Sequence, residues 1–167
     1  MNRFDFPKID LHLHLDGSLS YECFQELARE NELALTEQEI QEAVTVSPGC
    51  TSLVEYLKCF DLPTRLLQTE RALTLAAYDL IRQLEKQGLC YAEIRFAPQL
   101  HTAGSLTQQQ AVEAVLHGVQ LAKEANFHIQ IGILLCMMVT GPFKANEETA
   151  QLAVAYQKKG VAGLDLA

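Results

Sequence analysis

Four short apolar runs, separated by longer helical patterns, constrain the fold of this chain more than any other feature. They cover residues 9–15, 89–96, 128–135 and 161–166. Each run has the length and the apolar content of a β-strand. Strands that alternate with helices are joined by right-handed crossovers, so neighbouring strands run parallel. The sequence therefore predicts an α/β fold with four parallel strands.

The connection between the first two runs is long, and its patterns are all helical. Ser20 can cap a helix that extends to about Glu30. Thr36 and Ser52 each begin a capping-box pattern, in which a glutamate follows the hydroxyl residue three positions later. We therefore expect an all-helical insertion after the first strand.

The later helical patterns each lead directly into a strand. Apolar residues between positions 73 and 84 keep helical spacing, and Gly88 follows where a left-handed C-terminal cap would lie. Thr107 predicts the start of another helix. Asn146 predicts the start of a last helix, which ends at Gly160.

Two architectures fit this alternation. A doubly wound sheet usually carries a glycine-rich turn after its first strand, and neither the dinucleotide-binding nor the P-loop glycine pattern occurs in this chain. Polar residues alternate with apolar ones in the first two strands, whereas a sheet covered on both faces reads as continuous apolar runs. A polar inner face suits the mouth of a (β/α)8 barrel of the TIM type. We expect residues 1–167 to form a single domain equivalent to the N-terminal half of such a barrel, with open strand edges.

The first strand carries the clearest chemical pattern. Period-two alternation assigns one face to Ile9, Leu11, Leu13 and Leu15, and the other to Asp10, His12, His14 and Asp16. His12 and His14 would then project to the same side, with Cα atoms about 7 Å apart, so that both imidazoles could reach one metal ion. A polar strand face with hydrogen-bonded histidines is the alternative. Gly17 closes the strand at the end where barrel active sites lie, and this favours the metal interpretation.

The other titratable residues form no ligand pattern. His101, His117 and His128 lie singly and are expected to be surface or hydrogen-bonded histidines. Glu93 and Arg95 share one face of the second strand, where a structural ion pair is expected. The five cysteines are widely spaced and lack a C-x-x-C pattern, so buried reduced thiols are expected rather than disulfides or a thiolate zinc site.

The charge balance limits the choice of partners. The chain has 21 acidic and 13 basic residues and a formal charge of −8, which is the wrong sign for binding nucleic acid or an anionic membrane. Its longest strongly apolar stretch, residues 131–139, is less than half of the roughly 20 residues that a membrane-spanning helix needs. No apolar signal-peptide region begins the chain. These features predict a cytoplasmic protein with a small-molecule partner.

Three segments resemble the adenosine deaminase family, which lies within the amidohydrolase superfamily of metal-dependent barrels. Residues 9–19 read Ile-Asp-Leu-His-Leu-His-Leu-Asp-Gly-Ser-Leu and are similar to the opening signature of the family. Residues 91–98 read Tyr-Ala-Glu-Ile-Arg-Phe-Ala-Pro and resemble its second-strand segment. Residues 163–167 read Gly-Leu-Asp-Leu-Ala and resemble its fourth strand, so the likeness spans the whole chain.

The resemblance implies binding roles for three residues of the first segment. His12 and His14 would be ligands of one Zn²⁺ ion per complete active site, with His14 also near the ribose of a nucleoside. Asp16 would bind the sugar hydroxyls. Related adenine deaminases usually carry glutamate at this place, and AMP deaminases differ more after the H-x-H, so the resemblance favours adenosine as the substrate.

The resemblance also locates the lid and the catalytic groups. Helices around residues 51–67 would form an apolar lid over the substrate, with Leu57, Phe60 and Leu62 as gate residues. The family's third zinc histidine, catalytic glutamate, further histidine and zinc-binding aspartate belong to later strands, beyond Ala167. No catalytic residue is therefore assigned within this chain.

The activity implied is hydrolytic deamination of adenosine and deoxyadenosine, which releases ammonia and serves purine salvage. Zinc lowers the pKa of the water that attacks C6 of the purine. Cytidine-type deaminases need H-x-E with P-C-x-x-C, and this sequence has neither pattern. We expect the parent protein to be an adenosine deaminase, and the 167-residue chain alone to be inactive and to self-associate. The alternatives are a related adenine, AMP or N6-substituted adenosine deaminase, and a non-catalytic nucleoside-binding half-barrel.

Overall fold

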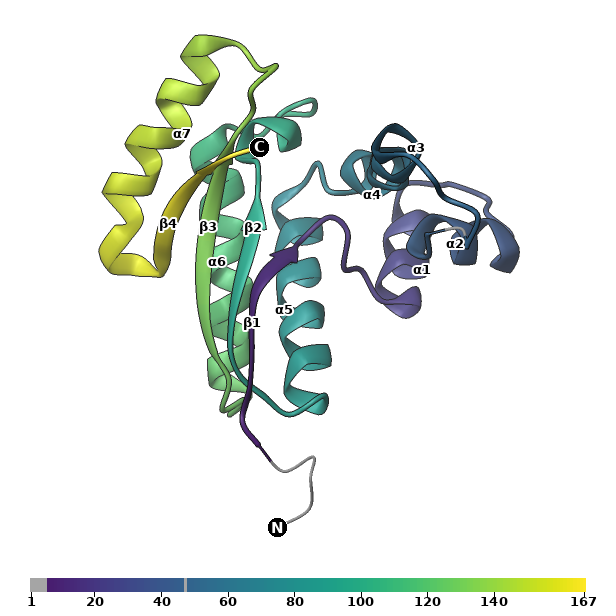
Figure 1. Ribbon diagram of the computed structural model, residues 1–167, viewed down its shortest axis with the longest axis horizontal. Helices are drawn as coiled ribbons and strands as arrows, with labels where there is room; N and C mark the ends of the chain where they lie inside the picture. The colour runs from purple at the N-terminus through teal and green to yellow at the C-terminus, as the bar shows by residue number, and fades with distance from the viewer. Residues whose placement is uncertain (1–5, 47) are drawn as a thin grey trace.

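A four-stranded parallel sheet forms the centre of the molecule in the computed structural model, which describes residues 6–46 and 48–167 (Figure 1). The strands are β1 (Lys8–His14), β2 (Leu89–Phe96), β3 (Gln130–Met137) and β4 (Val161–Leu166). Each strand pairs in parallel with the next, in the order β1-β2-β3-β4. The predicted parallel α/β fold is therefore confirmed.

Helices cover one face of this sheet and one end of β1. They are α1 (Tyr21–Glu30), α2 (Glu37–Val44), α3 (Leu53–Leu57), α4 (Asp61–Leu66), α5 (Glu70–Lys86), α6 (Gln108–Glu124) and α7 (Phe143–Tyr156), with 3-10 turns η1 (Lys58–Phe60), η2 (Pro98–His101) and η3 (Gln157–Lys159). Figure 1 shows α5 and α6 behind the sheet, and α1 to α4 in a lobe beyond the end of β1. None of the described helices is long and apolar enough to cross a membrane.

Hydroxyl caps begin most of the helices, as the sequence predicts. Ser20 accepts a hydrogen bond from the amide of Cys23, and Thr36 and Thr107 form complete capping boxes. The cap predicted at Asn146 is wrong, because α7 already begins at Phe143. Asn146 lies inside that helix, where its side-chain amide instead binds the backbone N–H and carbonyl of Met138.

The start of β3 differs from the sequence prediction because a side chain binds backbone groups there. β3 begins at Gln130 rather than at residue 128, since the amides of His128 and Ile129 donate to the carboxylate of Glu85. Amides bound in this way are not available to the ladder with β2.

An irregularity in β1 corrects the predicted division of its side chains between two faces. Paired residues of parallel strands point to the same side, and Ile9 pairs with Tyr91 whereas Leu13 pairs with Ile94. Ile9 and Leu13 therefore lie on opposite faces. The change occurs at a β-bulge between Asp10 and Leu13, where two residues oppose one residue of β2.

Cys90 is the extra residue at a second irregularity, where Lys8 pairs with Leu89 and Ile9 with Tyr91. The prediction of buried cysteines fails there, since Cys90 is exposed. Cys23 and Cys136 are buried, and the remaining two cysteines are half-buried.

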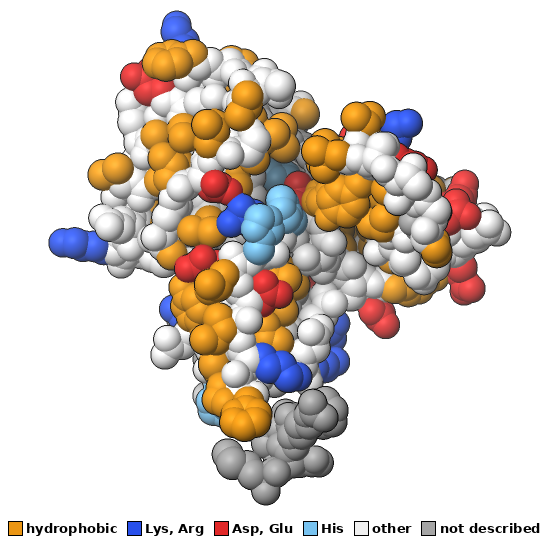
Figure 2. Space-filling view, in the orientation of Figure 1, with side chains coloured by type: hydrophobic (Ala, Val, Ile, Leu, Met, Phe, Trp, Pro, Cys, Tyr) orange, Lys and Arg blue, Asp and Glu red, His pale blue; other side chains and the backbone are white. Residues whose placement is uncertain are grey.

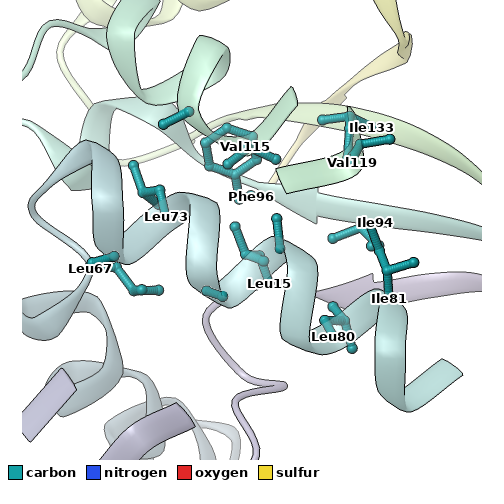
Figure 3. Close-up of a cluster of buried hydrophobic side chains, with 14 of the residues drawn as sticks. Leu15, Leu67, Leu73, Leu80, Ile81, Ile94, Phe96, Val115, Val119 and Ile133 are labelled. Atoms are coloured by element: carbon teal, nitrogen blue, oxygen red, sulfur yellow. The ribbon is translucent and has the colours of Figure 1, made fainter. Parts of the chain in front are cut away.

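The main core lies between the sheet and the pair of helices α5 and α6 (Figure 3). Side chains of Ile94, Phe96 and Ile133 on the strands are almost fully buried. They meet apolar side chains of the two helices, including Ile81 and Val115. This packing fixes the carboxyl ends of the strands, where the candidate site lies.

Candidate functional site

His12 and His14 lie together at the carboxyl end of β1, on the face without helices. Their ring centroids are 5.3 Å apart and their planes are tilted by 41°. Figure 2 shows histidine side chains, in pale blue, near the centre of the view, with basic and acidic side chains beside them. His12 lies within the bulge, where its amide donates a 3.0 Å hydrogen bond to Asp10 Oδ1. The two imidazoles therefore share a side, as the sequence predicts.

His14 is the more enclosed member of the pair. Its pKa is lowered by burial first, and then by the charges of His12 and Arg95. A lowered pKa favours the neutral imidazole, which is the form that binds metals.

Aromatic residues from the helical lobe cover one side of His14. The Phe60 ring lies edge-on to it, with centroids 5.5 Å apart, and Tyr56 packs against Phe60 at the same separation. Gly17 makes this approach possible, because a Cβ atom there would lie 2.6 Å from Phe60 Cε1. Phe60, a predicted gate residue, therefore contacts the candidate site, and Tyr56 is an additional residue that the sequence did not single out.

The other two predicted gate residues, Leu57 and Leu62, have different surroundings from Phe60. Leu57 is half exposed on α3, and Leu62 packs against the main apolar core. Among the described residues, neither leucine has a ring contact or a hydrogen bond with His12 or His14.

Asp16 lies just beyond the strand and is only 7% exposed. Burial raises the pKa of its carboxyl group, while the charge of His101 and the backbone amides of Asp16 and Gly17 oppose that shift. Its Oδ1 atom is buried without a hydrogen-bond partner among the described atoms. A buried carboxylate oxygen with free accepting capacity is suited to bind a hydroxyl group of a ligand.

Arg95 forms an ion pair, but its partner is not Glu93, the residue that the sequence predicts. Arg95 pairs with Asp165 of β4, with 2.5 Å between Nη1 and Oδ2. Glu93 instead accepts a 3.0 Å hydrogen bond from the Tyr91 hydroxyl. Because Arg95 pairs in register with His14, the Arg95–Asp165 pair lies beside the imidazoles. Sequence alone gave no signal for Asp165, since it comes from a distant strand.

The three single histidines have different surroundings. His117 and His128 are exposed. His101 is completely buried, and its Nδ1 lies 2.8 Å from the carbonyl oxygen of Leu67. The prediction of a hydrogen-bonded residue is confirmed for His101, but its burial beside Asp16 was not foreseen.

The imidazole pair suits a metal ion without completing a site by itself. Zinc sites in proteins use three or four protein ligands, and imidazole nitrogen is one of the preferred donors. Within residues 6–46 and 48–167, no three His, Cys, Asp or Glu side chains are grouped so that they could hold a metal. His12 and His14 therefore fit part of a zinc coordination sphere.

Solved structures share this fold. The crystal structure of N6-mAMP deaminase from Arabidopsis has a TM-score of 0.82 and 26% identity, covering 98% of this chain and 51% of that chain. A zinc-bound amidohydrolase from Burkholderia ambifaria has a TM-score of 0.81 at 18% identity, covering 98% and 44%, which is a likeness of fold alone. The fold places the chain in the class of the TIM-barrel amidohydrolases, and the four strands are consistent with the first half of such a barrel.

Sequence comparison narrows this class to a family. The family model described as "Adenosine deaminase" matches residues 7–167. The adenosine deaminase of Haemophilus ducreyi is 48% identical over 167 residues, covering 95% of this chain and 48% of that protein. The chain belongs to the adenosine deaminase family, and it spans about half the length of the curated relatives that it matches.

Proposed function

We propose that this chain supplies the first two zinc ligands and the sugar-binding carboxylate of a hydrolytic adenosine deaminase. The observation that carries the proposal is the imidazole pair of His12 and His14 at a strand end, next to the buried Asp16, in a member of this family. The reaction would release ammonia from adenosine or deoxyadenosine, as part of purine salvage in the cytoplasm.

Each residue of the site has a distinct part in this proposal. His12 and His14 hold Zn²⁺, which when bound supplies a nucleophile at neutral pH by lowering the pKa of water. Asp16 accepts hydrogen bonds from the ribose hydroxyls through its carboxylate group. Phe60 and Tyr56 exclude water from the side of the site that faces the helical lobe.

The rest of the machinery would come from outside these residues. The part of the chain that the structure describes holds no third metal ligand beside the imidazole pair. We propose that the further ligands and the general acid and base come from a segment equivalent to the other half of the longer relatives. On this proposal the 167-residue chain alone does not turn adenosine over.

Zinc titration tests the proposed ligands directly in this chain. Calorimetry with ZnCl₂ should detect binding, and His12→Ala and His14→Ala should each weaken it at least about tenfold, because each removes a donor. His117→Ala is the matched control, since that imidazole is exposed on α6 and far from the pair in sequence. Equal zinc affinity in all four proteins would refute the ligand assignment.

Ammonia release tests the proposed activity. Purified chain of confirmed intact mass, with added zinc, should give none from adenosine. The longer protein containing this segment should release ammonia and prefer adenosine over adenine, AMP and N6-methyl-AMP. Preference for another of these substrates would replace adenosine in the proposal. Nucleoside binding without turnover by the longer protein would support a non-catalytic binding module instead.

A further inference from the structure

His101 is the one fully buried histidine among the described residues, and the proposed function gives it no role. It ends the turn η2, which follows β2, and its ring packs against Phe96 with centroids 5.8 Å apart. Its Nδ1 lies 2.8 Å from the carbonyl oxygen of Leu67, at the end of α4. The ring is therefore held in one orientation by contacts on two sides.

The bond to Leu67 determines what the other ring nitrogen can do. A carbonyl oxygen only accepts hydrogen bonds, so Nδ1 of His101 carries the hydrogen and donates it. In the neutral ring, Nε2 is then an acceptor. This Nε2 atom is buried without a partner among the described atoms, and so is Oδ1 of Asp16. The Leu15 amide donates a 3.0 Å hydrogen bond to the Arg95 carbonyl, which places Asp16 beside Phe96, the residue that the His101 ring contacts. The two unsatisfied acceptors therefore lie in the same part of the interior, and their side chains also interact electrostatically.

Buried acceptors are rarely left without a donor, and one group can satisfy both of these. A single water molecule has two O–H donors and commonly bridges buried polar groups in proteins. We propose that His101 is a positioning residue for Asp16: a hydrogen-bond bridge between His101 Nε2 and Asp16 Oδ1 fixes the carboxyl group for the ligand. This inference rests on the proposed sugar-binding role of Asp16.

The same link connects the carboxyl group to the helical lobe. The loop that carries His101 is fastened to the end of α4 by two further hydrogen bonds, from Gln68 Nε2 to the Leu100 carbonyl and from the Ala103 amide to Gln68 Oε1, each 2.9 Å long. Together with the bond to Leu67, they join the turn after β2 to the lobe. The orientation of the Asp16 carboxyl group therefore depends on the position of the helical lobe relative to the turn after β2.

Two substitutions separate the two ring nitrogens of His101. His101→Asn places an amide N–H near the position of Nδ1, so it can keep the bond to Leu67 while removing Nε2. His101→Gln keeps a polar group near the position of Nε2 but loses that bond. His128→Asn is the matched control, because His128 is exposed.

A spectroscopic measurement on this chain tests the link without a nucleoside. The ¹³C resonance of the Asp16 carboxyl group should shift in His101→Asn and stay unchanged in His128→Asn. The His101 ¹⁵N spectrum should show hydrogen on Nδ1 and should change at Nε2 in Asp16→Asn. An unchanged Asp16 resonance in folded His101→Asn would overturn the proposed bridge.

Kinetics of the longer protein test the consequence for the ligand. His101→Asn should raise KM for adenosine about tenfold with little change in kcat, as expected when one hydrogen bond to a charged group is lost. His101→Gln should lie closer to the wild type. The double variant with Asp16→Asn should be no worse than Asp16→Asn alone, because the two changes break one link. A normal KM in Asp16→Asn would refute the proposed role of Asp16, whereas a raised KM there with a normal KM in His101→Asn would refute only the role of His101.

Discussion

At the scale of single residues, Gly17 shows how one missing side chain shapes the candidate site. It follows Asp16 directly, and its lack of a Cβ atom lets Phe60 reach the edge of His14. The absence of a side chain at Gly17 therefore allows the helical lobe to contact the end of β1. Glycine is needed here for close approach rather than for an unusual backbone angle.

Replacing Gly17 should consequently displace Phe60. Gly17→Ala places a methyl group 2.6 Å from Phe60 Cε1, so the ring must move away from His14, and we expect the free energy of unfolding to fall by about 1–2 kcal/mol. Urea denaturation measures this cost. In a Phe60→Leu background the same change should cost much less, since the clashing ring atom is gone. An equal cost in both backgrounds would show that Phe60 is not the group that Gly17 accommodates.

Cys23 provides a pH dependence that is separate from the site. Burial is the main cause that raises the pKa of its thiol from 9.0 to about 12, with smaller effects from Asp79 and Glu26. The unfolded chain loses this proton as the pH rises above 9, whereas the folded chain keeps it, so the folded state loses stability there.

We expect this thiol to lower the free energy of unfolding by about 1.4 kcal/mol between pH 8 and pH 10. Urea denaturation at the two pH values should show a smaller decline in Cys23→Ala than in the wild type. Cys90→Ala controls for removal of an exposed thiol. The same decline in all three proteins would contradict the assignment to Cys23.

At the scale of elements, the close pairing of α5 and α6 supports the sheet from behind. A Cβ atom at Gly118 of α6 would lie 2.5 Å from the Thr74 carbonyl oxygen and 2.7 Å from Ala77 Cβ. A 2.9 Å hydrogen bond from the Thr74 hydroxyl to the Ala114 carbonyl also joins the two helices. The two helices can approach this closely because α6 presents glycine at the crossing.

Gly118→Ala tests this packing against intrinsic helix propensity. Alanine normally stabilises a helix interior by up to about 1 kcal/mol relative to glycine. Here the methyl group would meet backbone, so we expect the free energy of unfolding to fall by about 2–3 kcal/mol. Urea denaturation gives the value, with Gln120→Ala on the exposed face of α6 as the control. A stabilised Gly118→Ala protein would contradict the close helix contact.

At the scale of the whole molecule, one face and two edges of the sheet are open. Within the described residues, β1 and β4 each pair with a single strand. Four apolar side chains on these strands are exposed, namely Ile9, Leu11, Leu164 and Leu166. Exposed edge strands with apolar side chains promote association between chains.

The chain by itself should therefore self-associate, as its sequence predicts. Sedimentation velocity over a range of concentrations should show oligomers, and Leu11→Lys or Leu166→Lys should reduce them because a charge on an edge strand opposes pairing. Leu53→Lys is the control, since Leu53 is even more exposed but lies on α3. A monomer at every concentration would contradict this prediction, and an effect of Leu53→Lys equal to the others would exclude the strand edges as the contact.

The sequence by itself determined the features that depend on neighbouring residues. Strand and helix periods predicted the parallel α/β fold, and hydroxyl caps located the starts of most helices. The spacing of His12 and His14 predicted that their rings share a side, and the rings do lie together although His12 is part of the bulge. Such features follow from backbone geometry within a few residues.

Only the tertiary structure decided the contacts between distant segments. Arg95 takes Asp165 as its partner across 70 positions, and the burial of His101 near Asp16 depends on the seating of the helical lobe. The bulge in β1 likewise depends on its register with β2. No local period encodes these choices, because each follows from which strand ends and turns the folded chain brings together.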